Sequence, residues 1–320
     1  MAVLFTILAV FAAFVLLLLC GIYFIFFKPN FPRHDEPPHP LDEEEYLHEY
    51  RDFINRSIEW FLSQKSEDVY ITSFDGFNLY GSFFEIPNGK AKGTVLMCHG
   101  FHGVAPRDFA GLPEFYLSLG YNVLVINQRA HNKSGGKYLT YGIKERFDCR
   151  DWILFLNNRL GTEKPIFLHG LSMGCATVLM TSGFELPPNV KGIVADCGYT
   201  SPYDIILSVL KNGLKLPAFP IMPLSEILVK CIAGFGLKEY STLDAMKTNR
   251  IPILFIDGDK DDFVPTWMTQ KNYDACVAEK RLVWFEGVKH AESFFVDKTK
   301  YETEVKDFLT RYCVIQQDFE

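Results

Sequence analysis

A nearly unbroken apolar run opens the chain. Residues 2–27 are almost entirely apolar, with only mild interruptions such as Thr6 and Gly21. At about 1.5 Å per residue, a helix of this length crosses the roughly 30 Å hydrocarbon core of a bilayer with room to tilt. The pattern therefore predicts one transmembrane helix over residues 1–27.

A cleaved signal peptide is the alternative for this run. Signal peptides have a basic start, a shorter apolar stretch and small residues at the cleavage site, and the run lacks these features. Leucines precede Cys20, whereas small residues precede a lipid-modified cysteine. The nearest basic residues, Lys28 and Arg33, both follow the run. Because basic flanks tend to stay in the cytoplasm, we expect a single-pass membrane protein with its main domain there.

The next two segments differ in pattern. Residues 28–40 are rich in proline and charge, which opposes helix and strand and predicts a linker. Residues 41–67 carry acidic residues first and then apolar positions at helical spacing. This second pattern predicts an amphipathic helix that covers the folded domain.

From residue 68 onward, short apolar segments alternate with helix-like segments. Strand-like segments are residues 69–73, 77–86, 94–98, 123–126, 166–169, 190–195, 253–256 and 282–285. Helix-like segments are residues 108–119, 141–160, 174–182 and 300–312. Strands separated by helices need crossover connections, so residues 68–320 are predicted to form an α/β domain with a mostly parallel sheet. The first two strands, joined at Asp75-Gly76, are expected to form a hairpin at the sheet edge.

The alternation breaks between residues 199 and 250. An apolar stretch over residues 214–224 contains Pro217, Pro220 and Pro223, and a helix-like segment follows at residues 225–233. We interpret residues 199–250 as a candidate cap over a site. A membrane-docking or partner surface, and plain core packing, remain alternatives for residues 214–235.

A Gly-x-Ser-x-Gly pentapeptide, residues 170–174, lies between a predicted strand and a predicted helix. A sharp strand-to-helix turn crowds the backbone, so glycines on both sides let Ser172 hold a strained conformation and project its hydroxyl. This context is typical of a nucleophile elbow and predicts Ser172 as the nucleophile. The amide of Met173 then points at the place where an oxyanion forms.

A serine nucleophile needs a base within hydrogen-bond reach, and histidine is the usual one. In the chain order that accompanies this elbow, the acid and the base both follow the serine. Seven of the eight histidines precede Ser172, and His290 follows it, just after the last predicted strand. His290 is therefore the predicted base.

The acid has three candidates in residues 258–265, namely Asp259, Asp261 and Asp262, and local spacing does not rank them. At this loop the chain resembles the α/β-hydrolase superfamily, in its lipase-like and serine aminopeptidase-like branches, whose acid loop reads Gly-x-x-Asp-x-x-Val-Pro. The resemblance aligns the acid with Asp261, and Asp259 and Asp262 stay open as alternatives. The acid orients His290 without taking its proton.

The resemblance extends to a second loop. Residues 99–103, His-Gly-Phe-His-Gly, are similar to the superfamily's oxyanion loop, which implies Phe101 as the second amide donor. Residues 129–134 resemble a turn of the superfamily, but Ala130 and Asn132 replace its glycines. The motifs occur in the expected order over residues 68–313. They imply an α/β-hydrolase fold: a mostly parallel central sheet flanked by helices, with a small cap insertion after strand 6, here preceded by one transmembrane helix.

Composition narrows the functional classes. The net charge of −7 and the lack of any Lys/Arg run argue against nucleic-acid binding. Eight cysteines without paired spacing are expected to be buried thiols, neither disulfide-bonded nor zinc ligands. His99 and His102 lack a matching set of acidic or cysteine ligands, so we expect them to be structural. No cofactor or metal is expected.

These features predict a membrane-anchored serine hydrolase that cleaves carboxylic esters of a small-molecule or lipid-like acyl substrate. An aminopeptidase-like amide hydrolase is the alternative within enzymes, and acids clustered at the pocket would favour it. A membrane-anchored binding protein that keeps the fold without catalysis is the alternative outside enzymes.

Overall fold

The computed structural model describes residues 1–29 and 47–313 of the 320-residue chain. Most of the predicted linker, residues 28–40, and the start of the predicted covering helix therefore lie outside the described residues. The sheet has eight strands in the order β1-β2-β4-β3-β5-β6-β7-β8. They are β1 (Glu67–Thr72), β2 (Asn78–Phe84), β3 (Thr94–Cys98), β4 (Asn122–Ile126), β5 (Ile166–Leu171), β6 (Val190–Asp196), β7 (Ile253–Gly258) and β8 (Lys280–Phe285).

The sheet is mostly parallel, which confirms the predicted fold class. Strands β3 to β8 pair in parallel, while β2 pairs antiparallel with both β1 and β4. The edge hairpin turns at Gly76, whose φ of 87° is in the left-handed region. Every predicted strand segment corresponds to one observed strand, because each is a short apolar run bounded by turn residues.

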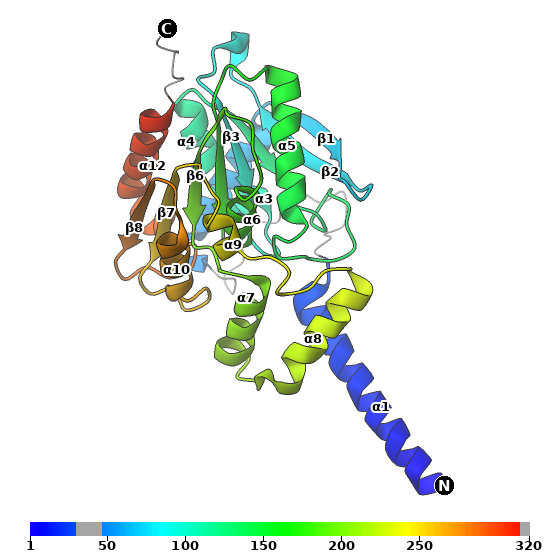
Figure 1. The fold of residues 1–320 in the computed structure, drawn as a ribbon. Helices are drawn as coiled ribbons and strands as arrows, with labels where there is room; N and C mark the ends of the chain where they lie inside the picture. The colour runs from blue at the N-terminus through cyan, green and yellow to red at the C-terminus, as the bar shows by residue number, and fades with distance from the viewer. Residues whose placement is uncertain (30–46, 314–320) are drawn as a thin grey trace.

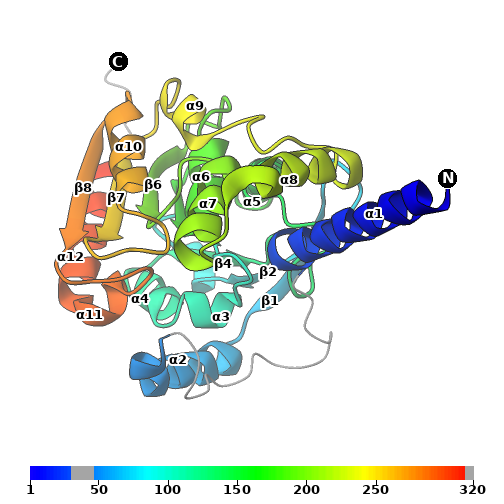
Figure 2. The ribbon, with the colours of Figure 1, turned by 90° about the horizontal axis from the view of Figure 1, so that it is seen from below.

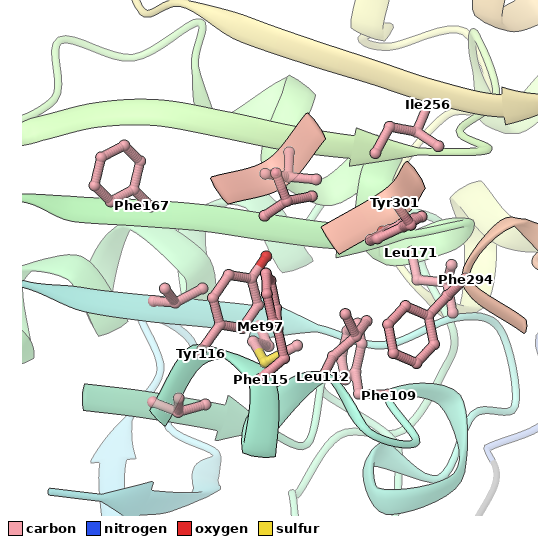
Figure 3. Packing of buried hydrophobic residues seen from close by; sticks show 14 of the residues in the cluster. Met97, Phe109, Leu112, Phe115, Tyr116, Phe167, Leu171, Ile256, Phe294 and Tyr301 are labelled. Carbon is pink, nitrogen blue, oxygen red and sulfur yellow. The ribbon is translucent and has the colours of Figure 1, made fainter. Parts of the chain in front are cut away.

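Helices cover both faces of the sheet (Figure 1). Successive residues of β3 alternate between the two faces, so Val95 and Met97 join one hydrophobic cluster while Leu96 and Cys98 join the other. On the first face lie α4 (Leu112–Ser118) and α12 (Lys298–Tyr312), and Figure 3 shows Tyr116 and Tyr301 packed there with Met97. The second face is covered by α5 (Glu145–Leu160) and α6 (Met173–Thr181).

Several helices differ from their predicted extents. Helix α5 begins at Glu145 and not at residue 141, because Tyr141 and Gly142 both have positive φ. The helix predicted over residues 108–119 is divided into α3 (Ala105–Asp108) and α4 by Gly111, whose φ is 80°. Helix α2 (Arg51–Ser63) follows a short turn of 3-10 helix and is shorter than the predicted 41–67. It buries Ile54 and Ile58 against the domain.

The insertion between β6 and β7 contains α7 (Pro202–Ser208), the π-helical turn η4 (Val209–Gly213), α8 (Ala218–Ile232) and α9 (Thr242–Met246). Helix α8 starts earlier than predicted, and Phe219 within it has a non-helical backbone. Figures 1 and 2 show α7 and α8 together at one end of the sheet, which is the place expected for a cap.

The apolar N-terminal run is helical. It comprises α1 (Ala2–Ile22) and the π-helical turn η1 (Tyr23–Phe27), and α1 contacts α8. Within the described residues, one helix, Val3–Phe27, is long and apolar enough to cross a membrane, a test that a signal sequence also passes. Figure 1 shows α1 extending away from the domain beyond its contact with α8.

The cysteines are all free, but they are not all buried. Cys20 and Cys231 are exposed, which corrects the expectation of buried thiols throughout. Cys20 lies on the apolar helix α1 and Cys231 on α8, and the sequence pattern does not reveal which helical face is covered. The buried thiols are Cys98, Cys149, Cys175, Cys197 and Cys276.

Candidate active site

Ser172 occupies the turn between β5 and α6. Its φ of 54° and ψ of −111° are a strained conformation for a side-chain-bearing residue, and its amide donates to the carbonyl of Asp196 at 2.9 Å. Gly170 and Gly174 have to lack a side chain because neighbouring backbone atoms lie too close to them. A Cβ on Gly174 would overlap the carbonyl of Cys98, and one on Gly170 would overlap the carbonyl of Gly174.

The structure brings together the three residues that the sequence predicts as nucleophile, base and acid. His290 Nε2 lies 2.9 Å from Ser172 Oγ, and His290 Nδ1 lies 2.6 Å from Asp261 Oδ2. All three residues are buried. An ionised carboxylate only accepts hydrogen bonds, so His290 Nδ1 carries a proton and donates it. In the neutral ring Nε2 is then the acceptor for the Ser172 hydroxyl.

The acid loop holds Asp261 in place. Its Oδ1 accepts from the amides of Phe263 at 3.0 Å and Val264 at 2.9 Å, while Oδ2 faces His290. Asp259 Oδ1 accepts instead from the amide of Gly287 at 2.7 Å, and Asp262 is exposed. Asp261 is therefore the one of these three neighbours that hydrogen-bonds to His290 in the part of the chain described.

The two predicted oxyanion donors flank Ser172. Met173 is the first residue of α6, so its amide has no acceptor within that helix. Phe101 lies in the loop after β3, and a Cβ on its neighbour Gly100 would be 3.5 Å from Ser172 Cβ. This loop is held by Asp108, whose Oδ2 accepts from the amide of Gly100 at 2.9 Å. No motif or spacing in the chain pointed to Asp108.

His99 is a structural residue under the oxyanion loop. Its Nε2 accepts from the amide of Gln128 at 3.0 Å, and its Nδ1 lies 2.9 Å from the carbonyl of Gly100. Burial lowers the pKa of His99 and so favours the neutral ring that this pattern needs. Gln128 also donates to the carbonyl of His99 at 2.6 Å and accepts from the Thr177 hydroxyl at 2.8 Å. Gln128 was likewise not found from the sequence.

In the turn at residues 129–134, two residues other than glycine adopt the left-handed backbone conformation that glycine favours. Ala130 has a φ of 60° and Asn132 a φ of 45°. Arg129 is buried, and it donates to Asp148 at 2.6 Å and to Asp75 at 2.9 Å, contacts that raise its pKa. The Arg129–Asp148 pair is buried and the pair with Asp75 is partly exposed. The left-handed backbone is thus present although Ala130 and Asn132 replace the glycines.

Two further carboxylates lie below the candidate site. Burial, followed by the charge of Asp261, raises the pKa of Asp257, which sits at the end of β7. Burial also raises the pKa of Asp196 to about 6, and Asp196 Oδ2 accepts from the Tyr301 hydroxyl at 2.8 Å. Burial therefore disfavours the charged form of both carboxyls, whereas the hydrogen bond to His290 Nδ1 is made by Asp261.

A metal-binding site is an alternative interpretation of some of the same residues. Ligand atoms of Cys197, Asp261 and His290 lie within 4.8 Å of one another. Burial raises the pKa of the Cys197 thiol and disfavours the thiolate that a metal needs. The imidazole nitrogens of His290 are already directed at Asp261 and Ser172. The donor set therefore fits a hydrogen-bonded triad better than a metal site.

An apolar cavity of about 140 Å³ lies beside Ser172. None of its eleven described lining residues is charged. They are Ile25, Phe26, Phe101, Tyr141, Ser172, Tyr199, Ile205, Ile206, Val209, Phe263 and Val264. The sequence did not reveal that Ile25 and Phe26, from the end of the N-terminal helix, would line the site. The hydroxyl of Tyr199 is buried and has no hydrogen-bond partner among the described residues.

Comparisons with known proteins agree with this architecture. The sequence profile of the alpha/beta hydrolase fold matches residues 93–220. An uncharacterized protein of Bacillus subtilis, YqkD, is 27% identical over 252 residues, which span 79% of this chain and 82% of the relative. An uncharacterized membrane protein of Saccharomyces cerevisiae, YNL320W, is 22% identical over 227 residues, covering 71% of this chain and 74% of that protein. The solved esterase Pf2001 of Pyrococcus furiosus is 26% identical and superposes with a TM-score of 0.65 over 80% of this chain and 94% of its own.

Proposed function

We propose that this chain is a membrane-anchored serine hydrolase that cleaves carboxylic esters. The match of residues 93–220 to the alpha/beta hydrolase fold and the similarity to the esterase Pf2001 support the proposal. One observation carries the proposal. Ser172, His290 and Asp261 form a continuous hydrogen-bonded chain, and the serine end of that chain faces an apolar cavity.

The proposed mechanism is acyl transfer to water. His290 Nε2 takes the proton of Ser172 as Oγ attacks the ester carbonyl, and the amides of Phe101 and Met173 donate to the oxyanion. The protonated histidine returns its proton to the leaving alcohol, which produces an acyl-enzyme. Water, deprotonated by His290, then releases the acid. Asp261 keeps the ring oriented and stabilises the imidazolium throughout.

The cavity favours an acyl ester over an aminopeptidase substrate. An aminopeptidase has to hold the free amine of its substrate, and acids at the pocket serve that purpose. The described residues that line this cavity carry no charge. An apolar wall instead suits the hydrocarbon part of an acyl group.

The backbone of Ser172 argues against a binding protein without catalysis. A serine at φ 54° and ψ −111° costs on the order of 1–3 kcal/mol, and such strain persists mostly where function needs it. A protein that only binds a ligand gains nothing from a strained serine directed at a histidine.

Retention of the N-terminal helix is supported by its contacts. Phe27 is fully buried, and the carbonyl of Phe26 accepts from the Tyr141 hydroxyl at 2.7 Å. Cleavage as a signal sequence would remove these groups from the folded domain. We therefore propose that the helix is a permanent anchor, and that the basic flank at Lys28 keeps the catalytic domain on the cytoplasmic side.

Membranes from cells that express the full chain test both parts of the proposal. After washing with alkaline carbonate, the membrane pellet is expected to hydrolyse p-nitrophenyl butyrate, and Ser172→Ala and His290→Ala lower kcat by at least about a thousandfold. Exposed counterparts, Ser63→Ala and His48→Ala, serve as matched controls that keep wild-type rates. Unchanged turnover in Ser172→Ala would contradict the nucleophile. A soluble product that lacks residues 1–27 would contradict the anchor.

A further inference from the structure

In the last turn of the anchor helix, some side chains pack into the domain and others are exposed on the surface. The turn η1 is π-helical, with the amide of Lys28 donating to the carbonyl of Tyr23 at 2.9 Å. Phe26 and Phe27 are 3% and 0% exposed, whereas Ile25 is 47% exposed. A π-helical turn is rare and is frequent at functional sites. Residues 25–27 thus belong to the anchor and to the catalytic domain together.

Hydrogen bonds fix this turn to the segment beside the oxyanion loop. The carbonyl of Phe26 accepts from the Tyr141 hydroxyl at 2.7 Å, and the carbonyl of Phe27 accepts from the amide of Leu139 at 3.2 Å. The ring of Tyr141 in turn stacks on Phe101 with centroids 5.4 Å apart. The position of the anchor is therefore coupled to the wall of the active site.

Residues of both the anchor helix and the cap form the wall of the cavity. Ile25 and Phe26 face it from the anchor, and Ile205, Ile206 and Val209 face it from the cap. Ser172 lies at the same cavity, so an acyl carbon attached to its Oγ continues into a space bounded by hydrocarbon. Ile25 and Phe263 both line the cavity and also reach the surface. We take the side bordered by Ile25, next to the N-terminal helix, as the entrance.

The surface around this entrance suits a bilayer. Helix α8 contacts α1 (Figure 2), and exposed apolar residues continue from the candidate span onto α8 and the segment before it, namely Phe24, Ile25, Leu214, Leu216, Phe219 and Ile227. Lys28, Lys211 and Lys215 are exposed nearby in the chain, whereas Lys230 on α8 pairs with Glu226 at 2.8 Å. Lysines beside an apolar surface match the anionic headgroups and hydrocarbon of a membrane interface.

We propose that Ile25 and Phe26 of the anchor helix are specificity-determining residues of the acyl site, and that the site takes the acyl chain of a substrate dissolved in the same membrane. This inference rests on the proposed hydrolase function. The chain of the lipid-like ester enters between the anchor and the cap, its carbonyl reaches Ser172, and the length that fits is limited by the side chains of the anchor.

Chain-length profiles of the full-length protein in detergent micelles test the role of the anchor. Ile25→Trp fills the entrance, so it is expected to lower the ratio of kcat/KM for p-nitrophenyl octanoate and longer esters to kcat/KM for the acetate by about tenfold or more. Ile7→Trp is the matched control, the same substitution at an exposed position of the same helix. It is expected to leave the profile unchanged.

The outcomes separate the two proposals. If wild type hydrolyses esters but Ile25→Trp gives the wild-type profile, the specificity role is overturned while the hydrolase stands. If wild type hydrolyses no ester at all, the proposed function itself fails. A small fluorophosphonate that labels Ile25→Trp as fast as wild type shows that the variant is folded and that only long chains are excluded.

Reconstituted phosphatidylcholine vesicles test the membrane route. A long-chain fluorogenic acyl ester is placed either in the vesicles that carry the enzyme or in separate vesicles mixed with them. The proposal predicts hydrolysis at least about tenfold faster when ester and enzyme share a bilayer, because transfer between vesicles is slow for a chain with strong burial in lipid. Equal rates would overturn the membrane route.

Discussion

Asp259, Asp261 and Asp262 lie within four positions of one loop, yet their surroundings differ. Asp261 hydrogen-bonds to His290, Asp259 accepts from the turn amide of Gly287, and Asp262 is exposed. The backbone of the loop, which directs two amides at Asp261 Oδ1, decides which carboxylate faces the imidazole. A residue's role at this scale follows from the geometry around it and not from its charge alone.

Substitutions at Asp261 and Asp262 distinguish the roles of these two acids. Asp261→Asn is expected to lower kcat by about 10⁴-fold, because the amide donates to Nδ1 and stabilises the tautomer in which Nε2 is protonated and cannot act as base. Asp262→Asn is the matched control and remains within about twofold of wild type. Steady-state ester hydrolysis measures both. Equal losses in Asp261→Asn and Asp262→Asn would contradict the assignment.

Single residues differ in how far the sequence reveals them. Ser172 and His290 were predictable because a strained turn needs glycines and because the chain order leaves one histidine. Asp108 and Gln128 were not, since they act on Gly100 and His99 through contacts that have no fixed spacing in the chain. The ranking of Asp261 came from a family resemblance, and the geometry now supplies a physical reason for it.

At the scale of elements, the elbow depends on β3 lying directly beneath α6. The start of α6 approaches the end of β3 so closely that a side chain at Gly174 would overlap the Cys98 carbonyl. Backbone on both sides leaves no flexible group to move aside. The packing of a helix on a strand therefore sets the sequence of the turn between them.

Gly174→Ala is accordingly expected to destabilise the fold by about 3 kcal/mol or more. For a domain of this size, that loss corresponds to a fall in Tm of roughly 6 °C or more. Gly213→Ala is the control, since a Cβ there meets no atom closer than 3.9 Å. Thermal unfolding followed by circular dichroism gives both values. A Tm for Gly174→Ala equal to that of Gly213→Ala would contradict the close approach.

Elements with mixed patterns were the ones that the sequence missed. Helix α10 (Trp267–Ala275) buries Thr269 and Asn272, whose side chains bond to Asp257 and Thr242, so it lacks a clear apolar stripe. Pro223 lies inside α8 without ending it, four residues after Phe219, whose backbone is not helical. A helix is therefore hard to predict from its pattern when it buries polar side chains or carries a proline near its start.

At the scale of the whole molecule, the buried histidines couple stability to pH. His169 is fully buried between Tyr116 and Tyr301, and burial lowers its pKa to about 3 from about 6.5 when unfolded. Below pH 6.5 the unfolded chain therefore binds a proton at His169 that the folded protein does not bind. Stability from this group is present above pH 6.5 and is lost as the pH falls toward 3.

His169→Gln isolates this effect. Between pH 7 and pH 5, the titration of His169 is expected to cost wild type about 2 kcal/mol, a loss that the variant lacks. Asp196, with its pKa raised to about 6, gains stability over the same range in both proteins and partly offsets the loss. Tm measured against pH is expected to fall more steeply in wild type than in His169→Gln, while exposed His48→Gln follows wild type. Parallel curves for all three would contradict the argument.

The contacts between the N-terminal helix and the domain were not predictable from the sequence. The apolar run indicates a helix able to span a membrane, but its uniform composition does not distinguish Phe26 and Phe27, which pack into the domain, from residues that face lipid. The overall fold, by contrast, was predictable, because alternating strands and helices leave few possible topologies. What the pattern lacks is any signal for contacts between an anchor and a site far along the chain.

If Ser172 is a nucleophile activated by His290, a fluorophosphonate will react with it in the full-length protein. Mass spectrometry is expected to find one adduct, located on the peptide that contains Ser172, absent from Ser172→Ala and formed far more slowly in His290→Ala. A folded wild-type protein that forms no adduct, or forms it on another residue, would contradict the claim.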